Sequence, residues 1–76
     1  MKNIYAVLQG TKYEGYSVRG VYADATAAEV AAAVLVAEEN QDGSSYERLG
    51  DDVAVWESSG GDYYVEVAEW PFDRAF

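Results

Sequence analysis

The sequence has no cysteine and no histidine. Without cysteine, the chain has no disulfide, no thiolate zinc site and no thiol nucleophile. Without histidine, the serine–histidine and cysteine–histidine catalytic arrangements are excluded, and no imidazole can bind a metal or act as a base near neutral pH. We therefore expect a protein that is not an enzyme and that has no cofactor and no metal site. A small fold without disulfides is typical of a reducing compartment, which predicts a cytoplasmic protein in its host cell.

Basic residues are also few. Five lysines and arginines stand against 14 aspartates and glutamates, so the formal net charge is -9. Anionic lipid and DNA repel such a chain, and we expect neither as a direct ligand. No apolar run approaches the roughly 18 residues that cross a bilayer. The first residues run directly into a strand pattern, so we expect no signal peptide and no membrane association.

The charge is unevenly distributed along the chain. Residues 1–37 hold three basic and three acidic residues, whereas residues 38–76 hold eleven acidic residues and two arginines, so the whole net charge lies in the second part. Aromatic residues are interleaved with these acids. They are Tyr46, Trp56, Tyr63, Tyr64, Trp70, Phe72 and Phe76. Carboxylates beside aromatics favour a surface suited to a basic partner, and the alternative is charge that serves only solubility.

Two strands are predicted near the N-terminus. Residues 4–8 alternate, with Ile4, Ala6 and Leu8 on one face. Residues 16–22 form the second strand and should place Tyr16, Val18, Gly20 and Tyr22 on one side. The short connection between the two strands favours an antiparallel hairpin.

A helix is predicted over residues 25–39, which contain seven alanines. Asp24 or Thr26 can act as its N-cap. Val30, Val34 and Ala37 share one stripe of this helix, and we expect that stripe to pack against the sheet.

Residues 40–50 read as a polar loop with a turn signal at residues 42–45. Residues 53–57 and 63–70 then form a second hairpin, and Pro71 ends the last strand because it has no amide donor. The sequence therefore predicts one α+β domain over residues 1–76, in the order ββαββ, with a four-stranded antiparallel sheet and one helix packed on one face.

Other patterns favour structural explanations. Asp42, Glu47, Asp51 and Asp52 lack the alternate spacing of a calcium loop, so a solvated acidic loop is the better interpretation. The glycines at positions 10, 15 and 20 do not match a phosphate-binding loop and are typical of turns. Strand tyrosines can stack bases in RNA-binding sheets, but those sheets carry basic residues, so core or interface tyrosines are favoured here.

A resemblance adds to this interpretation. The hairpin of residues 4–8 and 13–16, the segment Gly20-Val21-Tyr22 before an alanine-rich helix, and the closing stretch of residues 64–73 resemble small domains common in phage genomes. In size, charge and lack of catalytic residues, the chain is similar to phage anti-CRISPR and anti-restriction proteins. The resemblance implies an inhibitor that blocks a nucleic-acid site on a host defence complex, and it assigns no residue a role.

These observations predict a non-enzymatic, DNA-mimicking inhibitor that binds a basic surface of a nucleic-acid-handling host complex. The alternative is a small structural or adaptor domain that pairs through a sheet edge or an aromatic face. We expect a monomer or a weak dimer, the latter through Tyr64 and Trp70. The predicted partner-binding residues are Glu38, Glu39, Asp42, Asp51, Asp52, Glu57, Asp62, Glu66, Glu69, Trp56, Tyr64 and Trp70.

Overall fold

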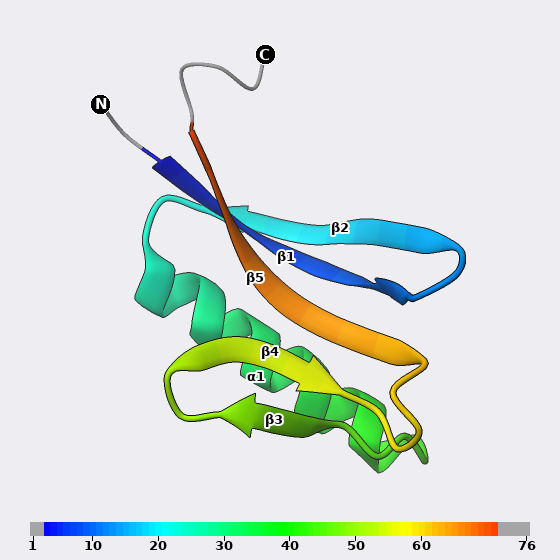
Figure 1. The fold of residues 1–76 in the computed structure, drawn as a ribbon. Helices are drawn as coiled ribbons and strands as arrows, with labels where there is room; N and C mark the ends of the chain where they lie inside the picture. The colour runs from blue at the N-terminus through cyan, green and yellow to red at the C-terminus, as the bar shows by residue number, and fades with distance from the viewer. Residues whose placement is uncertain (1–2, 72–76) are drawn as a thin grey trace.

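One helix crosses one face of an antiparallel sheet (Figure 1). The computed structural model describes residues 3–71, so Phe72, Asp73 and Phe76 lie outside the described residues. The elements are β1 (Asn3–Thr11), β2 (Gly15–Tyr22), α1 (Ala25–Gln41), β3 (Glu47–Gly50), β4 (Val53–Glu57) and β5 (Tyr63–Pro71). The sheet order is β2-β1-β5-β4-β3, and every neighbouring pair is antiparallel. The predicted α+β class with a single helix is confirmed, but the sheet has five strands.

The fifth strand is β3, in the segment predicted to be a loop. Its residues Glu47 and Arg48 pair with Glu57 and Trp56 of β4. The side chain of Asn40, in the last turn of α1, fixes the start of this strand. Its Oδ1 accepts from the Tyr46 N–H at 2.7 Å and its Nδ2 donates to the Tyr46 carbonyl at 3.1 Å. The Asn40 amide thus bonds both the N–H and the carbonyl of Tyr46, as the backbone of a neighbouring strand would.

The ends of α1 are set by local hydrogen bonds. Asp24 has extended backbone and is the N-cap, since its Oδ2 accepts from the Ala27 N–H at 3.2 Å. Thr26 lies inside the helix and is not the cap. At the other end Gly43 has φ +109°, a conformation that glycine adopts without strain. The Ser44 N–H donates to the Glu39 carbonyl at 3.1 Å, which closes the last turn.

The predicted inner face of the helix was wrong. Ala28, Ala32 and Val36 are the buried residues of α1, whereas Val30 and Val34 are 59% and 53% exposed. The helix is apolar on nearly every side, so its periodicity does not select one face. The structure buries the row of Ala28, Ala32 and Val36, whose two small alanine side chains let the helix approach the sheet closely.

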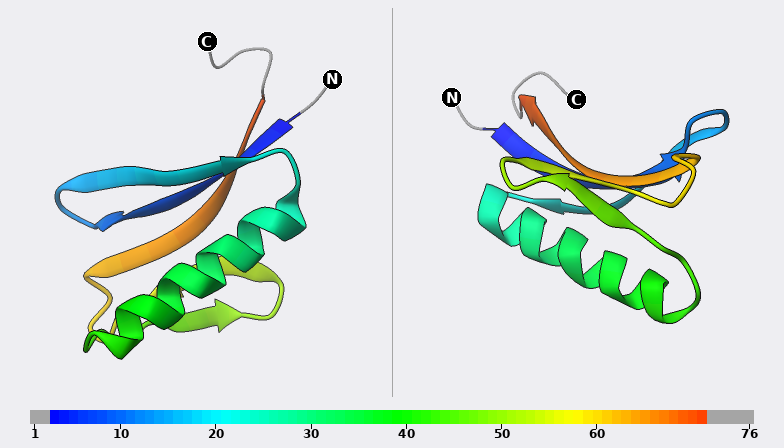
Figure 2. Two further views of the ribbon diagram at one scale, coloured as in Figure 1. Left: turned by 180° about the vertical axis from the view of Figure 1, so that it is seen from behind. Right: turned by 60° about the horizontal axis from the view of Figure 1, so that its bottom comes forward.

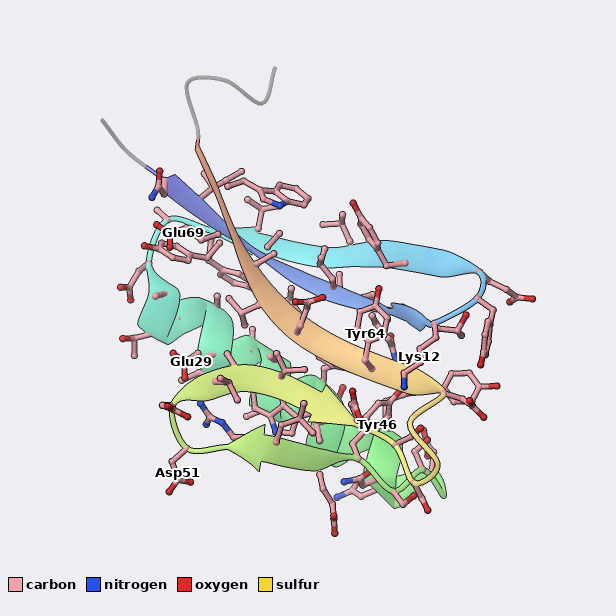
Figure 3. All side chains as sticks on the ribbon, viewed as in Figure 1. Lys12, Glu29, Tyr46, Asp51, Tyr64 and Glu69 are labelled. Atoms are coloured by element: carbon pink, nitrogen blue, oxygen red, sulfur yellow. The ribbon has the colours of Figure 1, made fainter. Side chains whose placement is uncertain are left out.

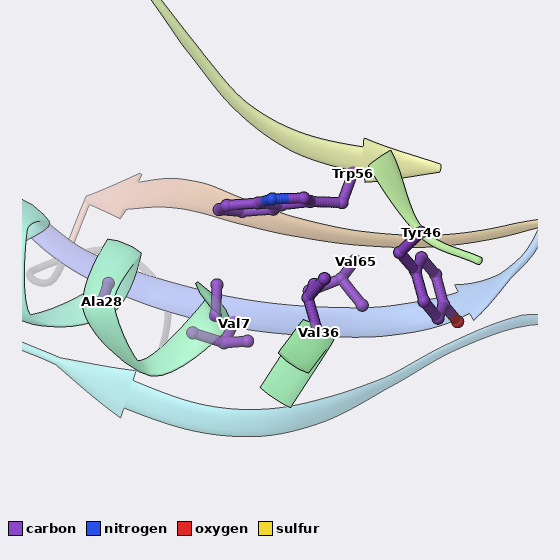
Figure 4. Packing of buried hydrophobic residues seen from close by; sticks show 7 residues of the cluster. Val7, Ala28, Val36, Tyr46, Trp56 and Val65 are labelled. Atoms are coloured by element: carbon purple, nitrogen blue, oxygen red, sulfur yellow. The ribbon is translucent and has the colours of Figure 1, made fainter. Parts of the chain in front are cut away.

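The core lies between α1 and the sheet (Figure 4). Val7 and Val65 come from the two central strands and are almost fully buried. Trp56 packs beside them with 6% exposure, so its predicted role as an exposed interface anchor is wrong. The Arg48 guanidinium lies 5.1 Å from the Trp56 ring centroid and covers the indole.

A β-bulge interrupts the alternation of β2. Val7 pairs with Gly20 and Leu8 pairs with Val18, so Arg19 is an extra residue in β2. The predicted single face of β2 is therefore divided: Tyr16 and Val18 lie on one side, and Gly20 and Tyr22 lie on the side that packs against the helix. Alternation alone could not place the bulge.

Candidate functional site

The face of the sheet turned away from α1 is largely apolar and carries three glutamates, and we call it the helix-free face. Figure 1 views the sheet from this side, and Figure 2 shows α1 on the other. Its residues are Ile4, Ala6 and Leu8 of β1 and their cross-strand neighbours Tyr16, Val18, Val21, Tyr64, Glu66, Ala68 and Trp70, together with Val55, Glu57 and Glu47 on the outer strands. Antiparallel sheets with one solvated face alternate between apolar and polar residues. On β1 both faces are apolar, and the helix-free face makes this sheet a candidate for an interaction surface.

The side chains at the centre of this face are buried in the single chain. Ile4, Ala6 and Leu8 are buried although α1, the one helix within residues 3–71, packs on the opposite face. Larger neighbours enclose them, because Trp70 pairs with Ile4 and Val18 pairs with Leu8. The surrounding Val18 is about half exposed. A partner would therefore meet a preformed apolar surface whose side chains are already held by their neighbours.

Three carboxylates lie on the same face. Glu66 pairs with Leu8 on one side and with Val55 on the other, so it stands among aliphatic side chains. Glu57 pairs with Tyr64 of β5 and with Glu47 of β3. Neighbouring strands are separated by about 4.8 Å, so the register brings the Glu47 and Glu57 carboxylates and the Tyr64 phenol into one row. Figure 3 labels Tyr64 on β5 from the helix-free side.

Glu47 and Glu57 repel each other. They form a directly paired position, and like charges at such a position are destabilising. The one ion pair within residues 3–71 joins Arg48 to Glu29 at 3.1 Å, so neither carboxylate has a cation within 4 Å. Folding tolerates this arrangement without gaining from it. Lys12 Nζ and Glu57 Oε1 both lie beside Gly61, so Lys12 compensates part of the charge of Glu57 without forming an ion pair. A cationic partner near Glu47 would relieve the repulsion that remains.

The remaining predicted acids lie outside this face. Asp51 and Asp52 are exposed in the turn between β3 and β4, and Asp62 is exposed just before β5, so these three lie at the two ends of β4. They add negative charge at the margin of the helix-free face. Glu69 pairs with Tyr5 on the helix side of the sheet, and its Oε2 accepts from Asn3 Nδ2.

The acids of the helix end form a separate group. Glu38 and Asp42 are exposed at the C-terminus of α1, and Glu39 Oε1 accepts from Gln9 Nε2 at 3.2 Å. Negative charge at a helix C-terminus is unfavourable for the helix dipole. These residues lie on the helix side of the sheet, so the structure divides the predicted acidic set between two surfaces.

Sequence reasoning missed two residues of the helix-free face. Glu47 was assigned to a loop, and Tyr16 was placed on the same side as Tyr22. The only signal for Glu47 is its position beside Tyr46 and Arg48, which contact the core and the Trp56 ring. Tyr16, 54% exposed, pairs with Gly10 and continues the row of Tyr64 onto β2.

A polar hollow of about 480 Å³ lies at the C-terminal end of α1. Its lining includes five serines, Glu39 and Arg19. Ser45 Oγ accepts from the Ser59 N–H and Ser58 Oγ accepts from the Tyr63 N–H, each at 3.2 Å. These hydroxyls therefore hold the turns of the chain in place. No three acidic side chains within residues 3–71 are grouped closely enough to hold a metal ion.

In the part of the chain that the structure describes, no helix has the length and apolar character needed to cross a membrane. Comparisons of the chain with protein-family models, with curated proteins and with solved structures found no match.

Proposed function

We propose that the chain is a non-enzymatic binding protein that docks its helix-free face on a basic surface of another protein. The observation that carries the proposal is the row of Glu47, Glu57 and Tyr64, with Glu66 and Trp70 on the same face. Aromatic side chains with large buried area dominate the energy of many interfaces. Here they stand beside carboxylates that form no ion pair within residues 3–71.

The charges favour a basic partner over a second copy of the chain. Two copies that met through their helix-free faces would bring six carboxylates together, those of Glu47, Glu57 and Glu66 from each copy. A partner with lysine or arginine at these positions would instead compensate the Glu47–Glu57 repulsion. Complementary charge also accelerates encounter and excludes wrong partners.

The basic surface best suited to this face is one that binds nucleic acid. DNA-binding grooves present lysine and arginine to a strand that carries one charge per about 3.4 Å. Carboxylates on neighbouring strands, about 4.8 Å apart, offer a comparable spacing. Asp51, Asp52 and Asp62 extend the negative charge along both ends of β4. A folded surface of this kind would occupy the groove and exclude the nucleic acid.

A host defence complex is the proposed target class. The chain is similar in size and charge to phage anti-CRISPR and anti-restriction proteins, with CRISPR surveillance complexes as the first choice and restriction enzymes as the second. Inhibition would follow from occupancy alone and would need no catalytic residue on this chain.

A second candidate is an adaptor that pairs through the outer edge of β2. This edge strand has eight residues and none of them is acidic. The bulge at Arg19 and the charge of that residue both hinder edge-to-edge pairing. For this reason we favour the helix-free face as the binding surface.

Competition for a purified defence complex tests the proposal. The protein should displace labelled DNA from the complex, and the triple variant Glu47→Lys, Glu57→Lys, Glu66→Lys should not. A matched control, Glu14→Lys with Glu38→Lys and Asp42→Lys, changes the net charge equally at residues of the β1–β2 turn and the end of α1. We expect the control to compete at low salt almost as the wild type does.

Each exposed ion pair contributes about 0–1 kcal/mol, so single reversals should have mild effects and the triple reversal a large one. Circular dichroism would establish that both triple variants are folded. Equal loss of competition in the two triple variants would show that only total charge matters. Retained competition in the helix-free-face variant would refute the proposed surface.

A further inference from the structure

The outward side of α1 is also apolar, and we call it the outer helix face. Its residues are Ala27, Val30, Ala33, Val34 and Ala37, and all five are exposed. Glu29 is the only charged residue between residues 25 and 37, and its carboxylate is paired with Arg48. In a chain of net charge -9, a helix surface of this length without a free charge is unusual.

The spacing of these residues is that of a helix–helix contact. Residues 27, 30, 34 and 37 are separated by three, four and three positions, the spacing of an a/d seam. The same stripe was predicted from the sequence to be buried, and the fold of one chain leaves it open. In Figure 2, left, α1 lies in front of the sheet and no other element covers it. Within residues 3–71, the stripe is therefore open to a partner.

A shallow groove borders the seam. It has a volume of about 280 Å³ and lies between α1 and β3, lined by Thr26, Glu29, Val30, Ala33 and Arg48. Side chains from a helix packed on the seam could enter it. The alanines at positions 27, 33 and 37 allow a second helix to approach closely, as ridges packed into grooves require.

We propose that two copies of this chain pair through their outer helix faces, with the two α1 helices antiparallel. The absence of free charge on this face favours a second copy of the chain over a basic partner. A basic partner gains nothing from a surface without carboxylates, whereas a second copy of an acidic chain can approach where charge is absent. This inference is independent of the proposed function.

Antiparallel packing follows from the acids at the end of α1. In a parallel pair, Glu38 and Asp42 of the two copies would meet. In an antiparallel pair, they are separated from each other and lie near the N-terminus of the other helix, where the positive end of the dipole offsets part of the repulsion from Asp24. The seam is also symmetric about position 32, so that Val30 faces Val34 of the other copy and Ala27 faces Ala37.

The dimer would be weak and concentration-dependent. A helix of 17 residues is about 25 Å long, and the contact it can make is smaller than the roughly 800 Å² per partner of a standard interface. The outer helix face and the helix-free face lie on opposite sides of the molecule (Figure 2). Both copies would therefore keep their helix-free faces available.

Sedimentation analysis of the purified protein, over concentrations that extend to the millimolar range, tests the pairing. We expect a monomer–dimer equilibrium that salt strengthens, because salt screens the repulsion between the copies. Val34→Asp should give a folded monomer. Val21→Asp is the matched control, since Val21 and Val34 are both 53% exposed but Val21 lies on β2. Wild-type protein that stays monomeric throughout, or equal loss of dimer in both variants, would overturn the proposal.

Cysteine cross-linking tests the orientation, and the chain has no cysteine of its own to interfere. Under mild oxidation, a mixture of Val30→Cys and Val34→Cys should form the mixed disulfide in excess over either homodimer, because an antiparallel pair brings these two positions together. Preferred disulfides within each single variant would mean a parallel pair, and no cross-link above that of a Val21→Cys control would contradict pairing through this face.

Discussion

At the scale of single residues, the two tryptophans differ in role. Trp56 is buried between β4 and the helix, whereas Trp70 lies on the helix-free face and pairs with Ile4. Replacing Trp56 with alanine should lower the free energy of unfolding by about 3–5 kcal/mol, because it removes a large core side chain. Trp70→Ala should cost less and should chiefly weaken binding.

Urea denaturation of the two variants would measure the difference. A small domain has little stability to lose, so Trp56→Ala should be largely unfolded. Equal stability of the two variants would contradict the assignment of Trp56 to the core and of Trp70 to the surface.

The paired carboxylates give a second prediction at this scale. Glu47→Gln removes one of two like charges at a directly paired position and keeps the side-chain shape. The isolated protein should therefore become more stable, by up to about 1 kcal/mol at low salt, and the gain should shrink as salt screens the repulsion. The same variant should bind the target more weakly. A loss of stability in thermal denaturation at low salt would show that Glu47 stabilises the fold through a contact other than its pairing.

At the scale of elements, the prediction for α1 was right in its extent and wrong in its buried face. Its extent was predicted to within two residues, and Asp24 was one of two candidate caps, because alanine content and cap chemistry are local. Its buried face could not, because Val30–Val34 and Ala32–Val36 form equally regular apolar rows. Packing against Val7 and Val65 decides between them, and that information is not local.

The two rows give a direct test. Val36→Asp should unfold the domain, because it places a charge with no partner in the core. Val34→Asp should keep the monomer folded, because the new carboxylate reaches water. Circular dichroism at low protein concentration would compare the two. If Val34→Asp were the variant that unfolds, the helix would be rotated relative to the structure described.

The strands were also predicted only in part. Alternation correctly predicted that Ile4, Ala6 and Leu8 share one face of β1, since the pairing of β1 with β5 has no bulge. It failed at Arg19, where one extra residue moves Tyr16 to the helix-free face, and at β3, whose residues are mostly exposed. The candidate site was accordingly predicted in part. Glu57, Glu66, Tyr64 and Trp70 were found, and Glu47 and Tyr16 were missed.

The side chain of Asn40 provides a prediction about β3. Asn40→Ala removes both hydrogen bonds to the Tyr46 backbone and leaves those groups partly buried, which should cost about 1–3 kcal/mol. Hydrogen exchange should accelerate first in residues 47–50. Uniform acceleration across the sheet would indicate that β3 does not open separately from the other strands.

At the scale of the whole molecule, two apolar surfaces lie on opposite sides of one small domain. The helix-free face carries carboxylates and aromatics, and the outer helix face carries no free charge. Their chemistry differs enough that we propose a basic partner for the first surface and a second copy for the other. Acidic composition alone would have predicted a uniform surface.

The central claim is that the helix-free face, and not acidity in general, binds basic partners. Titration of the isotopically labelled protein with an arginine-rich peptide, followed by NMR, tests it most directly. The account predicts that the largest chemical-shift changes occur at Tyr64, Glu66 and the Trp70 indole, with little change at Glu38 and Asp42. Shift changes of equal size at Glu38 and Asp42, with the Trp70 indole unmoved, would contradict the claim and indicate attraction to negative charge wherever it lies.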